Sequence, residues 1–306
     1  MSDLVRAEFL RLVSRRVMWI LLAGAVVVAA LVAVSASSGT RPLDAEDHAH
    51  AQLQADEANA SNVQYCKDFP EDCPDHEFVA ADFLRQPLDY EPYIRGVTDG
   101  GLLFVAFGAV LAAALIGGEF RSGSISTQLT FTPRRTPLMA AKLLAATTGA
   151  VSLTAVYFTT GTVIGTISFL MVRGAGDLTA TAAMPLMMLR MLLAALLVSA
   201  LAAALTFVVG STLLAVGLGL LAVVASEILS FDPYSFVSAW LWLLPMPNLM
   251  TILYTDYEYT RYDPVLMEHV PVVAMGFGQA VVYGVVLVLV TAVVGAIVFR
   301  RRDLLR

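Results

Sequence analysis

The sequence predicts an all-α membrane protein with six transmembrane helices, on three observations. The 306-residue chain is 58% hydrophobic and only 14% charged, whereas soluble domains are roughly half apolar and a quarter charged. Several uncharged apolar runs are long enough to cross a bilayer core, which takes about 20 helical residues. These runs do not alternate apolar and polar residues, as the strands of a membrane barrel would. Helices are therefore the structure that can satisfy their backbone in lipid.

The first element is a basic amphipathic helix at residues 1–16, where apolar residues recur at helical spacing and arginines lie between them. Such a helix suits the inner surface of a membrane, with Arg6, Phe9 and Arg11 as candidate interface residues. A plain extension of the first span is the alternative. A cleaved signal peptide is less consistent, because the uncharged run that follows is longer than a usual apolar core of such a peptide.

An acidic outer loop at residues 37–99 follows span 1, which is predicted at 17–36. The loop holds both cysteines of the chain, Cys66 and Cys73, in the segment CKDFPEDC. They form a candidate disulfide if the loop faces an oxidising compartment, and reduced thiols if it does not. No second Cys or Cys/His pair follows at zinc spacing, so we expect no metal site.

The remaining spans follow from the charge-free runs. The stretch 178–226 holds a single charge, Arg190, and is about twice as long as one span needs, so we place a bend at Gly210-Ser211. The predicted order is span 2 at 100–118, a cytoplasmic loop at 119–142, span 3 at 143–172, span 4 at 184–208, span 5 at 212–230, an outer segment at 231–274, span 6 at 275–299 and a tail at 300–306.

The outer segment before span 6 contains an ambiguous apolar stretch from Phe236 to Leu253. Pro245 and Pro247 would interrupt a seventh span. A re-entrant or interfacial hairpin is the better prediction, with its tryptophans at the headgroup level.

The basic residues set the orientation. They gather before span 1, between spans 2 and 3, and after span 6, whereas the acidic residues gather in the loop after span 1. The positive-inside rule then places both termini in the cytoplasm. We expect a multi-pass protein of the inner or plasma membrane of a bacterial cell.

Catalytic motifs are missing from the sequence. It has no GxxxxGK[ST] phosphate loop and no HExxH, and no nucleic-acid-binding module. We therefore expect no enzymatic site and no cofactor bound by this chain.

Two charged residues fall at predicted membrane depth, where charges are costly and often functional. Arg190 and Glu227 either line the outer part of a substrate path, or snorkel to the interface, or pair with each other. In span 2, Phe104, Phe107 and Leu111 are candidates to line an apolar passage, with plain helix packing as the alternative.

The segment EFRSGSISTQLTFTPRRTPLMAAK, residues 119–142, is the most informative part of the chain. It predicts a short polar helix after Gly123, ended by Pro133. It resembles the first cytoplasmic loop of ABC-2-type ABC transporter permeases, where a Glu after span 2, a Gly four residues on, and a Pro-Arg pair precede a Lys that opens span 3. The ending FRRRDL and the six-span layout are also similar. The matching or adjacent residues are Glu119, Arg121, Gly123, Pro133, Arg134, Arg135 and Lys142.

The resemblance implies a permease subunit that exports a hydrophobic or amphipathic substrate. It would pair with a second permease subunit, identical or related, and with separate ATP-binding subunits that hold ATP and Mg. Residues 119–142 would couple the chain to the ATPase, and substrate would pass between spans 2 and 5 of the two subunits. The alternative is a membrane-integral sensory or assembly protein that binds a ligand or partner through its outer loop.

Overall fold

The computed structural model confirms an all-α membrane protein. It describes residues 2–73, 76–131, 134–178, 183–230, 242–254, 259–263, 268–273 and 275–302. Within these ranges six helical segments are long and apolar enough to cross a membrane. They are built from α2 (Arg16–Ala36), α5 with α6 (Tyr90–Asp99 and Gly101–Arg121), α8 (Arg135–Arg173), α9 (Ala183–Val209), α10 (Thr212–Ser230) and α12 (Phe277–Arg301).

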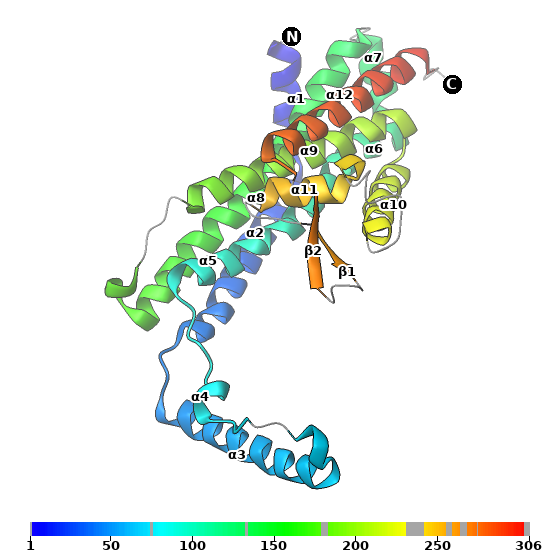
Figure 1. The fold of residues 1–306 in the computed structure, drawn as a ribbon. Helices are drawn as coiled ribbons and strands as arrows, with labels where there is room; N and C mark the ends of the chain where they lie inside the picture. The colour runs from blue at the N-terminus through cyan, green and yellow to red at the C-terminus, as the bar shows by residue number, and fades with distance from the viewer. Residues whose placement is uncertain are drawn as a thin grey trace.

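Helices α6, α8 and α9 pack against one another and form the centre of the bundle (Figure 1). Helix α2 packs on α8, α12 packs on α9, and α10 packs on α6 and α9. Small residues allow the central helices to approach closely. A Cβ atom at Gly108 of α6 would lie 3.1 Å from the Cβ of Ala150 of α8. Alanine would be crowded at this point of contact.

Both ends of the described chain lie at the same end of the bundle, as an even number of spans requires (Figure 1). We call this the terminus end. It also carries α1 (Ser2–Ser14) and α7 (Ser124–Phe131). Helix α1 packs along the first turns of α8. The expected amphipathic helix therefore exists, but one of its faces is covered by protein.

Two helices differ in length from the prediction. Residues 90–99, predicted to end the outer loop, form α5 and pack on α2 and α8. The Tyr93 hydroxyl donates to the carbonyl of Ala33 at 2.7 Å, which ties α5 to the end of α2. Helix α8 begins at Arg135, seven residues before Lys142. Lys142 is thus inside this helix and does not open it.

Residues 37–89 form an arm that projects from the end of the bundle opposite the termini (Figure 1). Its main helix, α3 (Ala45–Asp68), begins with a capping box in which Asp44 and Asp47 each accept from the other's backbone N–H. The chain returns along α3 through α4 (Ala80–Phe83). Single-turn 3₁₀ helices lie at 37–40, 70–72 and, outside the arm, 175–177.

Polar links hold the arm together, since α3 buries only alanines. The side chain of Asn59 donates to the carbonyl of Phe78 at 2.7 Å and accepts from its N–H at 2.8 Å. Cys66 and Cys73 form the predicted disulfide at the far end of α3. The described residues of the arm therefore form a hairpin of α3 and its returning chain.

The predicted bend between spans 4 and 5 is confirmed at Gly210, which has φ 72°. This left-handed conformation suits glycine and costs other residues energy. The guanidinium of Arg302 lies against the same glycine, so the turn is also crowded.

The segment before α12 contains a short helix and a β-hairpin. Helix α11 (Pro245–Leu253) packs against α9, α10 and α12 and is too short to span a bilayer. Strands β1 (Tyr259–Asp263) and β2 (Glu268–Val273) pair antiparallel, which the sequence analysis did not anticipate. Of the predicted re-entrant hairpin, Phe236 to Leu253, residues 236–241 lie outside the described residues.

Candidate functional site

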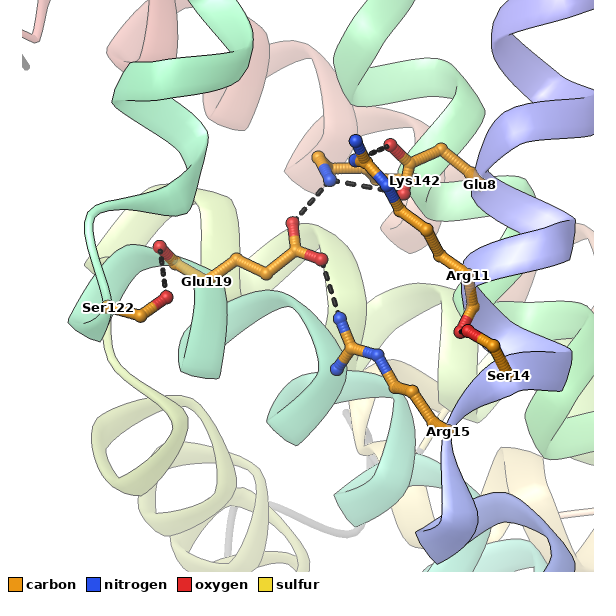
Figure 2. A network of polar contacts seen from close by, with 7 residues as sticks. All are labelled: Glu8, Arg11, Ser14, Arg15, Glu119, Ser122 and Lys142. Carbon is orange, nitrogen blue, oxygen red and sulfur yellow. Dashed lines mark hydrogen bonds and ion pairs between the residues drawn. The ribbon is translucent and has the colours of Figure 1, made fainter.

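A network of ion pairs joins three helices at the terminus end (Figure 2). Lys142 of α8 donates through Nζ to Oε2 of Glu8 at 3.2 Å and to the carboxylate of Glu119. Arg15 donates through Nη2 to Oε1 of Glu119 at 2.7 Å. Arg11 donates through Nη1 to Oε1 of Glu8 at 2.9 Å. These five residues, the α1–α6–α8 network, connect the N-terminal helix to the end of α6 and the start of α8.

The centre of the network is buried and its rim is accessible. The side chain of Lys142 is 3% exposed, and those of Glu8 and Glu119 are 6% and 10% exposed. The side chains of Arg15 and Arg11 are 37% and 48% exposed. Buried charges persist only when they are paired. One ammonium group shared by two carboxylates, with two arginines at the rim, satisfies this condition.

The helix dipole adds to the need for pairing at Glu119. Glu119 lies in the last turn of α6, where a negative charge faces the negative end of the helix dipole. Lys142 lies two turns into α8, beyond the turn in which the dipole acts, and is there held by its burial between two carboxylates. The ion pair with Lys142 therefore offsets the unfavourable position of Glu119.

An open groove of about 550 Å³ runs beside the network, between α1 and the α6–α7 connection. Its lining includes Arg11, Arg15 and Glu119, together with Ser122, Ser124 and Thr127. The groove therefore offers charged groups beside hydroxyl groups, which suits a polar group on a soluble partner.

Helix α7 lies at the edge of this groove and is anchored by one face. Gly123, with φ 70°, ends α6 and starts α7. Ile125 is 1% exposed and packs in the cluster with Ile116, Met139 and Phe207. At the other end of α7, the side chain of Phe131 is 83% exposed. A large apolar side chain is thus presented on a short, fixed helix outside the six spans.

Arg135 and Arg302 hold the terminus end of the bundle together. Arg135 donates through Nη1 to the carbonyls of Phe299, Arg300 and Arg302 at 2.9, 3.0 and 2.8 Å. Arg302 donates to the carbonyl of Val208 at 3.0 Å, and its guanidinium lies 5.5 Å from the centre of the Phe120 ring. The last turn of α12 is therefore tied to α8, α9 and α6.

The predicted coupling residues have different positions. Glu119 and Lys142 meet in the network, Gly123 makes the predicted bend, and Arg135 binds the end of α12. Arg121 and Arg134 are exposed, and Pro133 lies outside the described residues.

The N-terminal helix supplied a residue that the sequence analysis missed. Arg6 is exposed and Phe9 is half-buried, whereas Glu8 is buried. Glu8 lies one turn from Leu4 and from Leu12, so it is on the apolar face of this helix. In the sequence, this lone carboxylate on the apolar face of the helix could have indicated that Glu8 pairs with a buried cation.

The candidate path residues do not form one surface. Phe104 is 6% exposed and stacks on Tyr157 of α8 with ring centres 4.3 Å apart. Leu111 is also 6% exposed and packs with Leu12 and Met18, whereas Phe107 is 49% exposed. Phe104 and Leu111 thus serve helix packing, which was the alternative. Arg190 and Glu227 form no ion pair with each other in the described chain.

No group of three or more His, Cys, Asp or Glu side chains that could hold a metal ion occurs among the residues described by the structure.

Comparison with protein families places the chain in one of them. A family model described as "Protein of unknown function (DUF2705)" matches residues 96–305, more than half of the chain. The matched segment starts within α5 and leaves out the arm and α1. No curated protein and no solved structure matches the chain.

Proposed function

Because this chain belongs to the family described as a protein of unknown function, DUF2705, we propose its function from its site: it is the transmembrane subunit of an ABC-type transporter, driven by separate ATP-binding subunits. The observation that carries the proposal is Phe131, 83% exposed at the end of α7. Large exposed apolar side chains on a rigid element are typical anchors for a protein partner. The polar groove beside α7 supplies the rim of such an interface.

The connections of α7 support a mechanical role. Helix α7 follows α6 after a single glycine turn, and α6 lies in the centre of the bundle. The α1–α6–α8 network fixes the end of α6 to α1 and α8. A partner that pushes on α7 would move these helices together, which can convert closure of an ATPase into rocking of the spans.

The proposed orientation places the terminus end in the cytoplasm of a cell membrane. The exposed or rim arginines at that end fit the positive-inside rule, and the disulfide of the arm fits an oxidising compartment on the other side. In this proposal ATP and Mg bind to the partner. A second permease subunit, the same or related, completes the path for a hydrophobic or amphipathic export substrate.

Co-purification tests the proposal. The tagged chain is expressed in its native host and isolated in mild detergent. The eluate is assayed for ATP hydrolysis and for proteins with a GxxxxGK[ST] motif. We expect such an ATPase with the wild type and about tenfold less of it with Phe131→Ala, since anchors of this type carry much of an interface.

Phe107→Ala is the matched control, because Phe107 is also an exposed phenylalanine but lies on the apolar surface of α6. Its ATPase yield should equal that of the wild type. Absence of any ATPase from the wild-type eluate would contradict the proposal.

The arm favours a second candidate, a sensory or assembly protein that binds through its outer segment. Leu53 and Val63 of α3 are 62% and 57% exposed, on an element outside the candidate spans. Deletion of residues 45–83 separates the two candidates. A transporter subunit would keep its ATPase, whereas an arm-dependent receptor would lose its partner.

A further inference from the structure

Arg190 of α9 is a buried cation that forms no ion pair in the part of the chain that the structure describes. The residue is 9% exposed, and its Nε and Nη1 atoms are buried without a hydrogen bond. It forms no ion pair with a described carboxylate, including Asp99, whose Oδ1 is likewise buried and unbonded. A guanidinium stays charged at any ordinary pH and has five N–H donors to satisfy.

One contact partly compensates this charge. The guanidinium carbon lies 4.6 Å from the centre of the Phe277 ring, which gives a cation–π interaction. A ring face accepts no bidentate hydrogen bond, however, so the planar edge of the guanidinium keeps unused donors. Carboxylates and phosphates match that edge in geometry and charge.

Phe277 is the first residue of α12, so the guanidinium lies beside a helix N-terminus. This terminus has no side-chain cap, because the N-cap residue is Gly276, and it has no acidic residue in its first turn. Its first N–H groups and the positive end of the dipole favour an anion. A Cβ added at Gly276 or Gly278 would meet nothing within 4 Å, so there is open space at this turn.

The surroundings of the site are apolar. Met191, the neighbour of Arg190, is buried in a cluster with Val105, Leu253 and Ala280. Farther along, the outer faces of α10 and α12 expose leucines and valines. A ligand here would place its anionic group on Arg190 and the first turn of α12, and its apolar part along the bundle.

We propose that Arg190 and the N-terminus of α12 bind the single anionic headgroup, phosphate or carboxylate, of an amphiphile with an apolar tail. The site does not require an ATPase partner, and it gives the substrate class if the proposed transport function holds. A negative result for amphiphile binding would leave the ATPase co-purification result unaffected. A negative co-purification result would likewise leave the binding site untouched.

Direct binding tests this site. The purified chain in detergent is titrated with dioleoylphosphatidylglycerol and, separately, with dioleoylphosphatidylcholine, glycerol 3-phosphate and oleate, and bound species are counted by native mass spectrometry. We expect the wild type to bind phosphatidylglycerol and oleate more tightly than the other two probes. Arg190→Gln should weaken both by roughly tenfold or more, as expected for lost hydrogen bonds to a charged group.

Arg173→Gln is the matched control. Arg173 ends α8, and its guanidinium is already paired with Asp89 at 3.4 Å and Asp177 at 2.9 Å. The Arg173→Gln variant should bind the probes as tightly as the wild type does. Equal loss in both variants would overturn the site, as would binding of glycerol 3-phosphate as tightly as phosphatidylglycerol.

Thermal unfolding guards against a folding defect. Arg190→Met removes the charge but keeps much of the volume, so without added lipid its melting temperature should equal or exceed that of the wild type. Phosphatidylglycerol should raise the melting temperature of the wild type and leave that of Arg190→Met unchanged. A lower melting temperature for Arg190→Met without lipid would mean that Arg190 has a structural partner, and would overturn the proposal.

Discussion

Lys142 has two carboxylate neighbours and almost no contact with solvent. Its removal leaves Glu8 and Glu119 facing each other with only the rim arginines, Arg11 and Arg15, as partners. We expect Lys142→Met to lower the free energy of unfolding by about 3–5 kcal/mol, the usual cost of breaking a buried pair on one side. Glu8→Gln should cost less, because Glu119 keeps both Lys142 and Arg15. Unfolding in detergent, followed by tryptophan fluorescence, measures the order.

Arg11→Met is the control for this series. Arg11 pairs with the same Glu8, but its side chain is 48% exposed, and exposed pairs contribute about 0–1 kcal/mol. A Lys142→Met variant as stable as Arg11→Met would show that the network is not a buried core.

At this scale the sequence identified some of the site and missed the rest. Glu119 and Lys142 could be selected because each is a lone charge at the edge of an apolar run. Their pairing with Glu8 and Arg15 could not, since it depends on α1 packing along α8. Arg302 was predicted only as part of the tail at 300–306, because its contacts with Val208 and Phe120 are set by the fold.

At the scale of elements, the turn between α9 and α10 depends on Gly210. An alanine there would hold a left-handed conformation, which costs about 1–2 kcal/mol, and would displace the guanidinium of Arg302. We therefore expect Gly210→Ala to lower the unfolding free energy by at least that amount.

Gly217→Ala provides a control of opposite sign. Gly217 is inside α10 and an added Cβ would meet nothing within 4 Å. Alanine is favoured over glycine within helices by up to about 1 kcal/mol. Denaturant unfolding of the two variants should move in opposite directions, and an equal loss of stability would contradict this account of the turn.

The arm should respond to acid through one ion pair. Arg85 donates to Asp47 through Nε and Nη2 at 2.9 and 2.8 Å. This pairing, helped by the backbone N–H of Asp44, lowers the pKa of the Asp47 carboxyl below its ordinary value. A lowered pKa stabilises the fold above the unfolded pKa of about 3.9, and the stabilisation is lost as the pH falls through the folded pKa.

Hydrogen exchange of the first turns of α3 measures this response. Protection, corrected for the intrinsic exchange rate, should stay constant from about pH 8 to about pH 5 and decrease below about pH 4. Arg85→Gln should remove most of the decrease, because it lowers protection above about pH 4, where the ion pair acts, more than in acid. Arg41→Gln is the control, since its contact with Asp47 is 3.5 Å long and its side chain is 55% exposed. Protection that rises on acidification would exclude this role for Asp47.

The elements themselves were largely predictable, and their ends were not. Span-length apolar runs and the Gly210 bend follow from hydrophobicity and from bilayer thickness. The start of α8 at Arg135 and the packing of α5 extend helices into polar sequence. There, tertiary hydrogen bonds such as that of Tyr93 replace the bilayer as the stabilising environment.

At the scale of the whole molecule, the two ends of the bundle carry different chemistry. The terminus end gathers the network, the groove and the exposed Phe131. The opposite end carries the disulfide-linked arm and Arg190. In the proposed transporter the first end receives force from a soluble partner, and the second end meets the anionic amphiphile.

Site-specific photo-crosslinking tests the central claim most directly. A photoreactive amino acid replaces Phe131 in cells, and in a parallel strain it replaces Phe107. The account predicts a crosslink from position 131 to a protein that contains the GxxxxGK[ST] motif, and none to that protein from position 107. Crosslinks from position 131 that reach only lipid, or no protein with this motif, would contradict the claim that α7 docks an ATPase.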